Sequence, residues 1–124
     1  MSNLKHYKMF INGEWVESES KKTFETLNPE NNKPWAVVPE ASTKDVDKAV
    51  KAAQTAFEGE WPKLLPRERA KFLRAIGEKL RDNAELLGKI ETIDTGKLFR
   101  ETNKQAIYIA EYYDYYAGLA DKVE

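Results

Sequence analysis

The chain has 124 residues, a length that suits one domain with a hydrophobic core of its own. Its 20 basic and 21 acidic residues give a net charge of −1, which disfavours a nucleic-acid binder and a protein held on an anionic membrane. The mean hydropathy is −0.70, no apolar run approaches the ~20 residues of a membrane span, and the first residues lack a secretory signal, so we expect no membrane partner and a cytoplasmic protein.

Residues for self-contained catalysis are scarce. Cysteine is absent, which excludes disulfides, thiolate metal sites and thiol nucleophiles within the sequence. The one histidine, His6, lies near the N-terminus, where chains fray, and we expect it to be a disordered tail residue. We therefore predict no catalytic residue in these 124 residues.

Residues 8–40 are expected to form short strands. Asn12-Gly13 lies between the apolar runs Met9–Ile11 and Glu14–Val16. Both turn residues tolerate the positive φ of a type I′ turn, so this pattern predicts a β-hairpin.

A second hairpin is predicted directly afterwards. Residues 23–27 alternate between polar and apolar side chains and are rich in β-formers, and residues 35–38 form the returning apolar run. The segment 28–34 between them contains Asn and Pro residues typical of turns. We expect the two runs to pair antiparallel.

Residues 42–123 change to a helical period. Ser42 or Thr43 is expected to cap a first helix, with Asp45 completing a capping box and Gly59 ending the helix. The apolar side chains of this helix lie on one stripe: Val46, Ala49, Val50, Ala53, Ala56 and Phe57.

The next helical region begins at Pro66 and continues to Thr92, as one long helix or as two with Asp82 capping the second, and Gly96 ends it. A last helix is predicted over residues 101–121, with Ala106, Ala110, Tyr113 and Ala117 on one stripe. Strands followed by helices indicate an α+β class on general rules. The helices carry more apolar surface than a hairpin can cover, so we expect a partner layer outside this sequence, as in a piece of a larger fold.

Several blocks together resemble a known family. The sequence is similar to the opening of NAD(P)-dependent aldehyde dehydrogenases, and the likeness covers nearly the whole chain. The blocks that carry it are Phe10–Trp15, Asn28-Pro29, Asp45–Val50, Glu91–Lys97 and Tyr115–Lys122.

The resemblance implies an α/β fold with a Rossmann-like cofactor domain. Residues 1–124 would be the N-terminal part of that domain, with strands over 8–40 and helices over 42–123 but without the central parallel sheet. Members of the family oxidise aldehydes to carboxylic acids with a cysteine nucleophile, a glutamate base and NAD or NADP. These catalytic residues belong to later segments, so the resemblance implies that this chain alone is inactive and contributes no cofactor-binding residue. Its partner would be the remainder of the fold, and an aldehyde would bind only to the complete enzyme.

Two candidate sites follow from the same resemblance. The family's monovalent cation site would take backbone carbonyls from Thr26 and Leu27 and the carboxylate of Asp94. Alternatively, Asp94 caps its own turn through Asx geometry. The substrate tunnel would be lined by Tyr108, although a tyrosine at that position also suits ordinary helix packing.

A second function hypothesis stays open at this point. A hairpin with amphipathic helices also describes a non-catalytic protein-interaction module that presents an apolar face to a partner. The reading frame after residue 124 would distinguish the two, because the enzyme requires a later cysteine and a cofactor-binding turn.

Overall fold

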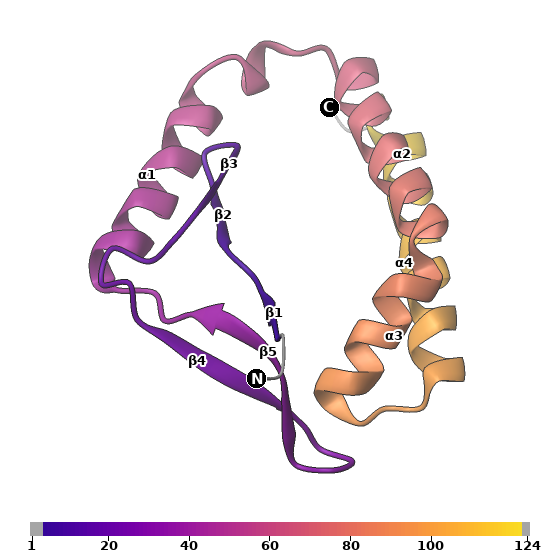
Figure 1. Cartoon of the computed structure of the whole chain (residues 1–124). Helices are drawn as coiled ribbons and strands as arrows, with labels where there is room; N and C mark the ends of the chain where they lie inside the picture. Colours follow the sequence, from indigo (N-terminus) through magenta and orange to yellow (C-terminus); the bar gives the residue numbers. More distant parts are fainter. Residues whose placement is uncertain (1–3, 123–124) are drawn as a thin grey trace. The chain divides into compact units, whose positions relative to one another are not determined.

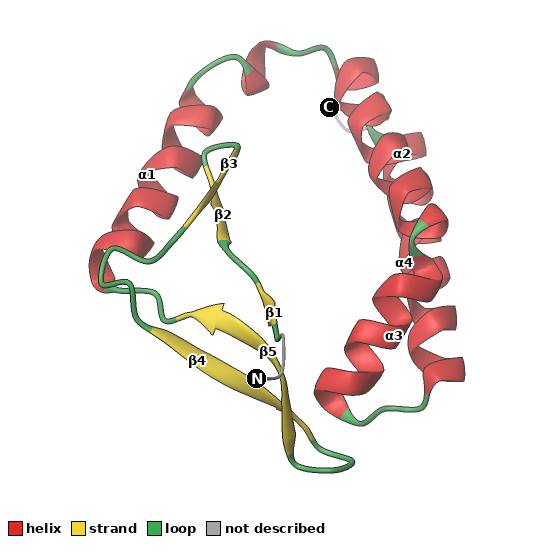
Figure 2. Ribbon diagram, in the orientation of Figure 1, coloured by secondary structure: helices red, strands yellow, loops and turns green. Residues whose placement is uncertain are grey.

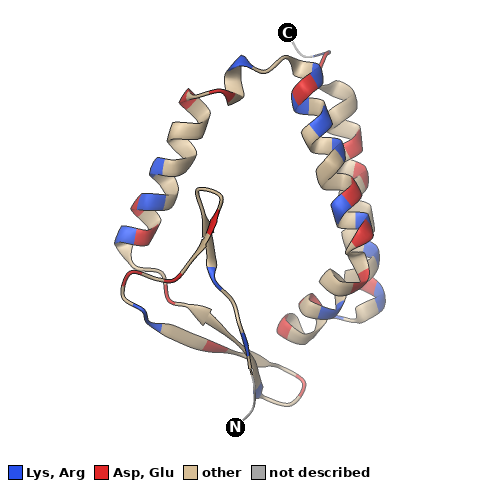
Figure 3. Ribbon diagram, turned by 45° about the horizontal axis from the view of Figure 1, so that its top comes forward, with Lys and Arg blue, Asp and Glu red and all other residues tan. Residues whose placement is uncertain are grey.

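The computed structural model describes residues 4–122 and divides them into two compact units, residues 4–63 and 64–122. Within this described part, the strands belong to the first unit, and the second is built from helices alone (Figure 2). Acidic and basic residues are interspersed along the helices of both units, in keeping with the balanced charge (Figure 3).

The first unit contains a three-stranded sheet in the order β1-β5-β4 and a separate hairpin, β2-β3 (Figure 1). Strand β1 runs parallel to β5, and β4 runs antiparallel to it. One α-helix and a short 3-10 helix, η1, follow the strands. The elements are β1 Lys5–His6, β2 Met9–Ile11, β3 Glu14–Val16, β4 Thr23–Asn28, β5 Lys33–Pro39, α1 Thr43–Glu58 and η1 Trp61–Lys63.

The β2-β3 hairpin confirms the first turn prediction. Asn12 and Gly13 both adopt positive φ, 53° and 80°, as a type I′ turn requires. Phe10 pairs with Trp15 across the strands, and their ring centroids lie 5.0 Å apart. Both rings are more than half exposed, so the hairpin leaves an apolar face open.

The β4-β5 hairpin is confirmed too, with a difference at its turn. The register shifts between Thr26 and Leu27, and Leu27 pairs with Pro34, which was expected in the turn but lies in β5. Strand β5 is central, but β1 pairs with it only at Ala36 and Val37. Pro34 has no backbone N–H to donate. It is tolerated in β5 because β1 does not pair with this strand at that position.

The prediction for His6 is wrong. His6 pairs with Val37 in β1, and the next amide, from Tyr7, donates to the Val37 carbonyl at 2.9 Å. Strand β1 has only two residues, which are too few to show the alternation of polar and apolar side chains that marks a strand. Its partner, about 30 residues further along the chain, orders this segment.

Helix α1 begins as the sequence predicts. Ser42 is its N-cap, and Ser42 and Asp45 form the reciprocal capping box. Gly59 is the C-cap. The helix buries little of its apolar stripe within this unit, since Val46, Val50 and Phe57 are 53%, 63% and 67% exposed.

In the second unit, the region predicted as one long helix or two forms two helices. Helix α2 spans Pro66–Asp82, α3 spans Ala84–Thr95 and α4 spans Phe99–Leu119. The break falls at Asn83, so Asp82 is the last residue of α2 rather than a cap. Gly96 ends α3 in the left-handed conformation, φ 75°, as predicted.

Helix α4 packs against both α2 and α3 through small residues. Ala106, Ala110 and Ala117 are at most 8% exposed, which confirms the predicted stripe. Thr102 is fully buried, and its hydroxyl donates to the Gly88 carbonyl at 2.9 Å. The large apolar side chains of α2, among them Phe72 and Ile76, stay 52% and 43% exposed.

Across residues 4–122, none of the helices combines the length and the apolar character that crossing a bilayer requires.

Candidate functional site

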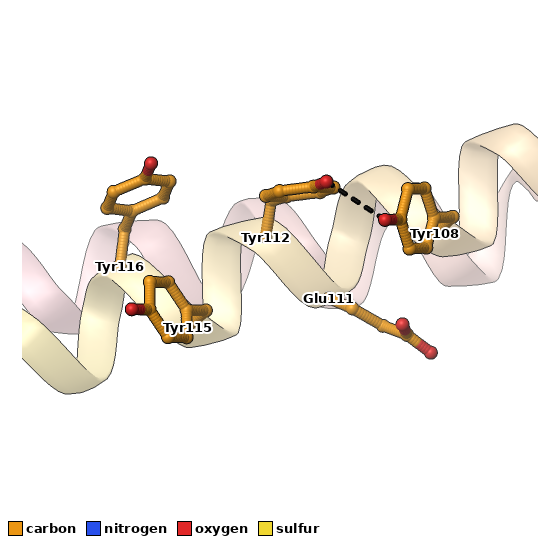
Figure 4. Close-up of a pocket in the computed structure, with 5 residues that line it drawn as sticks. All are labelled: Tyr108, Glu111, Tyr112, Tyr115 and Tyr116. Atoms are coloured by element: carbon orange, nitrogen blue, oxygen red, sulfur yellow. Dashed lines mark hydrogen bonds between the residues drawn. The ribbon is translucent and has the colours of Figure 1, made fainter.

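The most distinctive surface of the second unit is a group of aromatic side chains on α4, which we call the tyrosine face. Residues 108, 112 and 116 follow one another at intervals of four, and residues 111 and 115 form the adjacent row, so the spacing of a helix places all five together. The tyrosines are 47–63% exposed. The members, which line one shallow hollow (Figure 4), are Tyr108, Glu111, Tyr112, Tyr115 and Tyr116.

Two perpendicular ring pairs make up this face. The Tyr108 and Tyr112 rings lie 5.0 Å apart at 82°, and their hydroxyl oxygens are hydrogen-bonded at 2.9 Å. The Tyr115 and Tyr116 rings lie 5.4 Å apart at 83°. Edge-to-face geometry suits the ring quadrupoles, so each pair is held in a defined orientation.

The electrostatics of the tyrosine face are neutral to negative. The hydrogen bond with Tyr108 raises the pKa of the Tyr112 phenol above its usual value of 10.0, so this ring is uncharged at neutral pH. Glu111 supplies the carboxylate among the lining residues. Phenols and a carboxylate in an open hollow can bind a ligand and accept hydrogen bonds from it.

Of the residues on this face, the sequence analysis singled out Tyr108 alone. The structure places Tyr108 in this hollow together with three further tyrosines, all of them about half exposed or more. The helical spacing was a usable signal for the group, because residues at i and i+4 share a face. That Tyr108 lines a substrate tunnel stays a prediction.

The candidate cation ligands fall in both units. Thr26 and Leu27 lie in β4 on the two sides of its register shift, and Asp94 lies in the exposed last turn of α3. Groups of three or more acidic or histidine side chains with metal-binding geometry are not found among residues 4–122. The cation site stays a prediction, and so does the Asx alternative for Asp94.

The Asp45 carboxyl group accepts hydrogen bonds from the start of α1 and from the loop before β4. Asp45 is 3% exposed, and its carboxylate accepts hydrogen bonds from the Ser42 amide at 2.8 Å and the Ser42 hydroxyl at 2.7 Å. It also accepts from the Glu19 amide at 3.1 Å and the Ser18 hydroxyl at 3.3 Å. These donors, those of Ser42 foremost, lower the pKa of Asp45 from 3.8 to about 2. The carboxylate thus joins the start of α1 to the loop before β4.

The comparison of sequences identifies the class of protein. A sequence model of the aldehyde dehydrogenase family matches residues 15–124. The chain belongs to the aldehyde dehydrogenase family.

Individual relatives agree. A (Z)-2-((N-methylformamido)methylene)-5-hydroxybutyrolactone dehydrogenase from Acinetobacter baylyi is 41% identical over 122 residues, which are 98% of this chain and 25% of that protein. A betaine aldehyde dehydrogenase from Bacillus subtilis is 41% identical over 115 residues, which are 92% of this chain and 24% of the relative.

Solved structures show the same fold. An NAD-dependent aldehyde dehydrogenase from Sinorhizobium meliloti superposes with a TM-score of 0.93 at 30% identity, over 98% of this chain and 24% of that one. A point mutant of betaine aldehyde dehydrogenase from Staphylococcus aureus, solved in complex with NAD+, gives 0.89 at 40% identity, over 94% and 24%.

These matches confirm the resemblance and the α/β family fold. The chain spans about a quarter of the length of the relatives it matches. The order of the elements indicated an α+β class. That class describes this quarter of the length taken alone, whereas the fold of the family is α/β. The stand-alone interaction module is not favoured.

Proposed function

We propose that the chain is the N-terminal part of an aldehyde dehydrogenase that oxidises an aldehyde to a carboxylic acid with NAD or NADP. The observation that carries the proposal is the match of nearly the whole chain, 98%, to about a quarter of an NAD-dependent aldehyde dehydrogenase. Within that enzyme, residues 1–124 belong to the cofactor-binding domain as a structural part. A cytoplasmic location stays a prediction.

The residues present do not fit a dinucleotide by themselves. A dinucleotide pyrophosphate binds at a glycine-rich turn between a strand and a helix N-terminus. Here the turn from β5 to α1 is Glu40–Ser42, without glycine, and the N-terminus of α1 is already occupied by the Asp45 carboxylate. We therefore assign cofactor binding to the rest of the enzyme.

The remainder of the fold is the partner that we propose for the apolar faces. Helix α1 exposes Val50 and Phe57, and α2 exposes Phe72 and Ile76. Apolar surface on this scale is unusual for an isolated protein and typical of a surface that another layer covers.

The site assignments belong to the same proposal. Tyr108 lines the path of the aldehyde, where its ring narrows the path and gives the substrate a flat wall. The carbonyls of Thr26 and Leu27 and the carboxylate of Asp94 contribute to a monovalent cation site, since all-oxygen ligation suits a hard cation.

The proposal is tested with the complete reading frame that encodes this chain. Full-length protein and the 124-residue chain are each incubated with a series of aldehydes and with NAD+ or NADP+, and NADH or NADPH is followed at 340 nm. We expect aldehyde-dependent reduction by the full-length protein and none by the chain. A reading frame that ends at residue 124, or turnover by the chain alone, would contradict the proposal.

A further inference from the structure

We propose that Asn12 is a site of spontaneous deamidation, at which the backbone amide of Gly13 attacks the Asn12 side chain and converts it to aspartate or isoaspartate. Water is the co-reactant, and the reaction needs no second protein. The inference rests on the two hairpins of the first unit and not on the proposed function.

The reaction has two steps and releases ammonia. In the first, the Gly13 nitrogen bonds to the side-chain carbonyl carbon of Asn12, the Cγ–Nδ2 bond breaks, and the amide proton leaves with the ammonia. The product is a five-membered succinimide ring. In the second step, water adds to one of the two ring carbonyl carbons and the ring opens. Addition at Cγ leaves aspartate, whereas addition at the backbone carbonyl carbon leaves isoaspartate, in which the chain continues through Cγ.

The Gly13 amide is available for this attack. Asn12 and Gly13 are both exposed, and a Cβ atom built on Gly13 would meet nothing within 4 Å. Glycine also has no side chain beside its own nitrogen to hinder the approach. Among residues 4–122, none accepts a backbone hydrogen bond from the Gly13 amide, so this nucleophile is not held elsewhere.

The hairpin that carries the pair can open. Ring closure requires rotation of the Asn12 backbone away from its turn conformation, φ 53°. Strands β2 and β3 have 3 residues each and form a sheet of their own. Because a two-stranded hairpin is only marginally stable, little free energy separates this turn from its open forms.

The turn of the β4-β5 hairpin holds an asparagine in a similar conformation but with a different neighbour. Asn32 is exposed and has a φ of 55°. The amide that would attack its side chain belongs to Lys33, which carries a side chain of its own. This amide also donates a hydrogen bond to Asn31 Oδ1 at 3.0 Å. The structure therefore favours deamidation at the β2-β3 turn over the β4-β5 turn.

The test uses the protein that the complete reading frame encodes, kept in mildly alkaline buffer in its folded state and in urea. Peptide mapping by mass spectrometry measures the replacement of the amide by a hydroxyl at each asparagine, and electron-transfer fragmentation distinguishes isoaspartate from aspartate. In the folded protein we expect Asn12 to react roughly tenfold or more faster than Asn32, because glycine follows only the first of them. Circular dichroism confirms that the protein stays folded during the incubation.

A variant separates the Asn-Gly pair from its structural setting. Lys33→Gly creates a second such pair, while the amide of residue 33 can still donate to Asn31. In urea, where this hydrogen bond is lost, both pairs should react at the same rate. In the folded protein, Asn32 of this variant should react roughly two- to tenfold more slowly than Asn12, the factor expected from one hydrogen bond. Adding Asn31→Ala removes the acceptor and should bring the two rates together.

Two results would overturn the inference. The first is a folded protein in which Asn12 reacts no faster than Asn32. The second is a folded Lys33→Gly variant in which both pairs react equally fast, because the unengaged Gly13 amide would then make no difference. Either result leaves the proposed dehydrogenase untouched, since its activity is measured separately with aldehydes.

Discussion

Gly88 in α3 lies where α4 approaches most closely. A Cβ atom added there would lie 2.9 Å from both the backbone nitrogen and the Cα of Asn103. Backbone atoms cannot move aside as a flexible side chain can, so Gly88→Ala must push the two helices apart. We expect this variant to lower the free energy of unfolding by about 1–3 kcal/mol, measured by urea titration of the ellipticity at 222 nm.

Gly118 in α4 gives the matched control, because an added Cβ meets nothing within 4 Å. Gly118→Ala is expected to raise the free energy of unfolding by about 0.5 kcal/mol through helix propensity. Two variants that shift stability in the same direction would argue against close packing of α3 on α4.

At the scale of single elements, the start of α1 depends on the Asp45 carboxylate. Its pKa is lowered from 3.8 to about 2 by the donors of Ser42, then of Glu19 and Ser18. A carboxyl group with a lowered pKa in the folded state stabilises the fold above its unfolded pKa and loses that contribution as the pH falls. We therefore expect the stability of the first unit to decline from pH 4 towards pH 2. Asp45→Asn is expected to lower the stability of this unit at neutral pH and to make the decline below pH 4 smaller. Fluorescence of Trp15, Trp35 and Trp61 reports on the first unit alone, since all three lie before residue 64.

Asp47 supplies the comparison for this measurement. It lies in the same helix but is exposed. Asp47→Asn should leave the decline below pH 4 in place. If Asp45→Asn retains the parental pH profile, the carboxylate does not hold the loop to the helix.

The elements that sequence alone predicts are those with a local cause. Asn12-Gly13 defines its hairpin, Ser42 and Asp45 define the start of α1, and Gly96 ends α3. Strand β1 escaped prediction because His6 is ordered by Val37, a partner distant in the sequence. The hydrogen bonds from the Ser18–Glu19 loop to Asp45 escaped for the same reason.

The two candidate sites differ in the same way, because one has a local pattern in the sequence and the other does not. The tyrosine face could be read from helical spacing, because its five members lie within three turns of one helix. The predicted cation site would take residues 26, 27 and 94, which are far apart in the sequence, and no local pattern joins them. The set comes from the family resemblance, and a structure with a bound cation tests it.

At the scale of the whole molecule, the exposed apolar side chains decide between a complete protein and a part of one. Phe57 in α1 is 67% exposed in this chain. Phe57→Ala should therefore change the stability of the 124-residue chain by less than about 0.5 kcal/mol, as a surface substitution does. If the remainder of the enzyme covers α1, the same substitution in the full-length protein removes a buried ring and should cost about 3–5 kcal/mol.

Thr55, on the same helix and exposed, gives the control for both proteins. Thr55→Ala should be near neutral in the chain and in the full-length enzyme, when both are measured by chemical denaturation. The difference between the two Phe57→Ala values isolates what the missing layer contributes at that ring. Equal values in the chain and in the full-length protein would mean that the apolar stripe of α1 faces water in both, and the argument for a covering layer on that helix would fail.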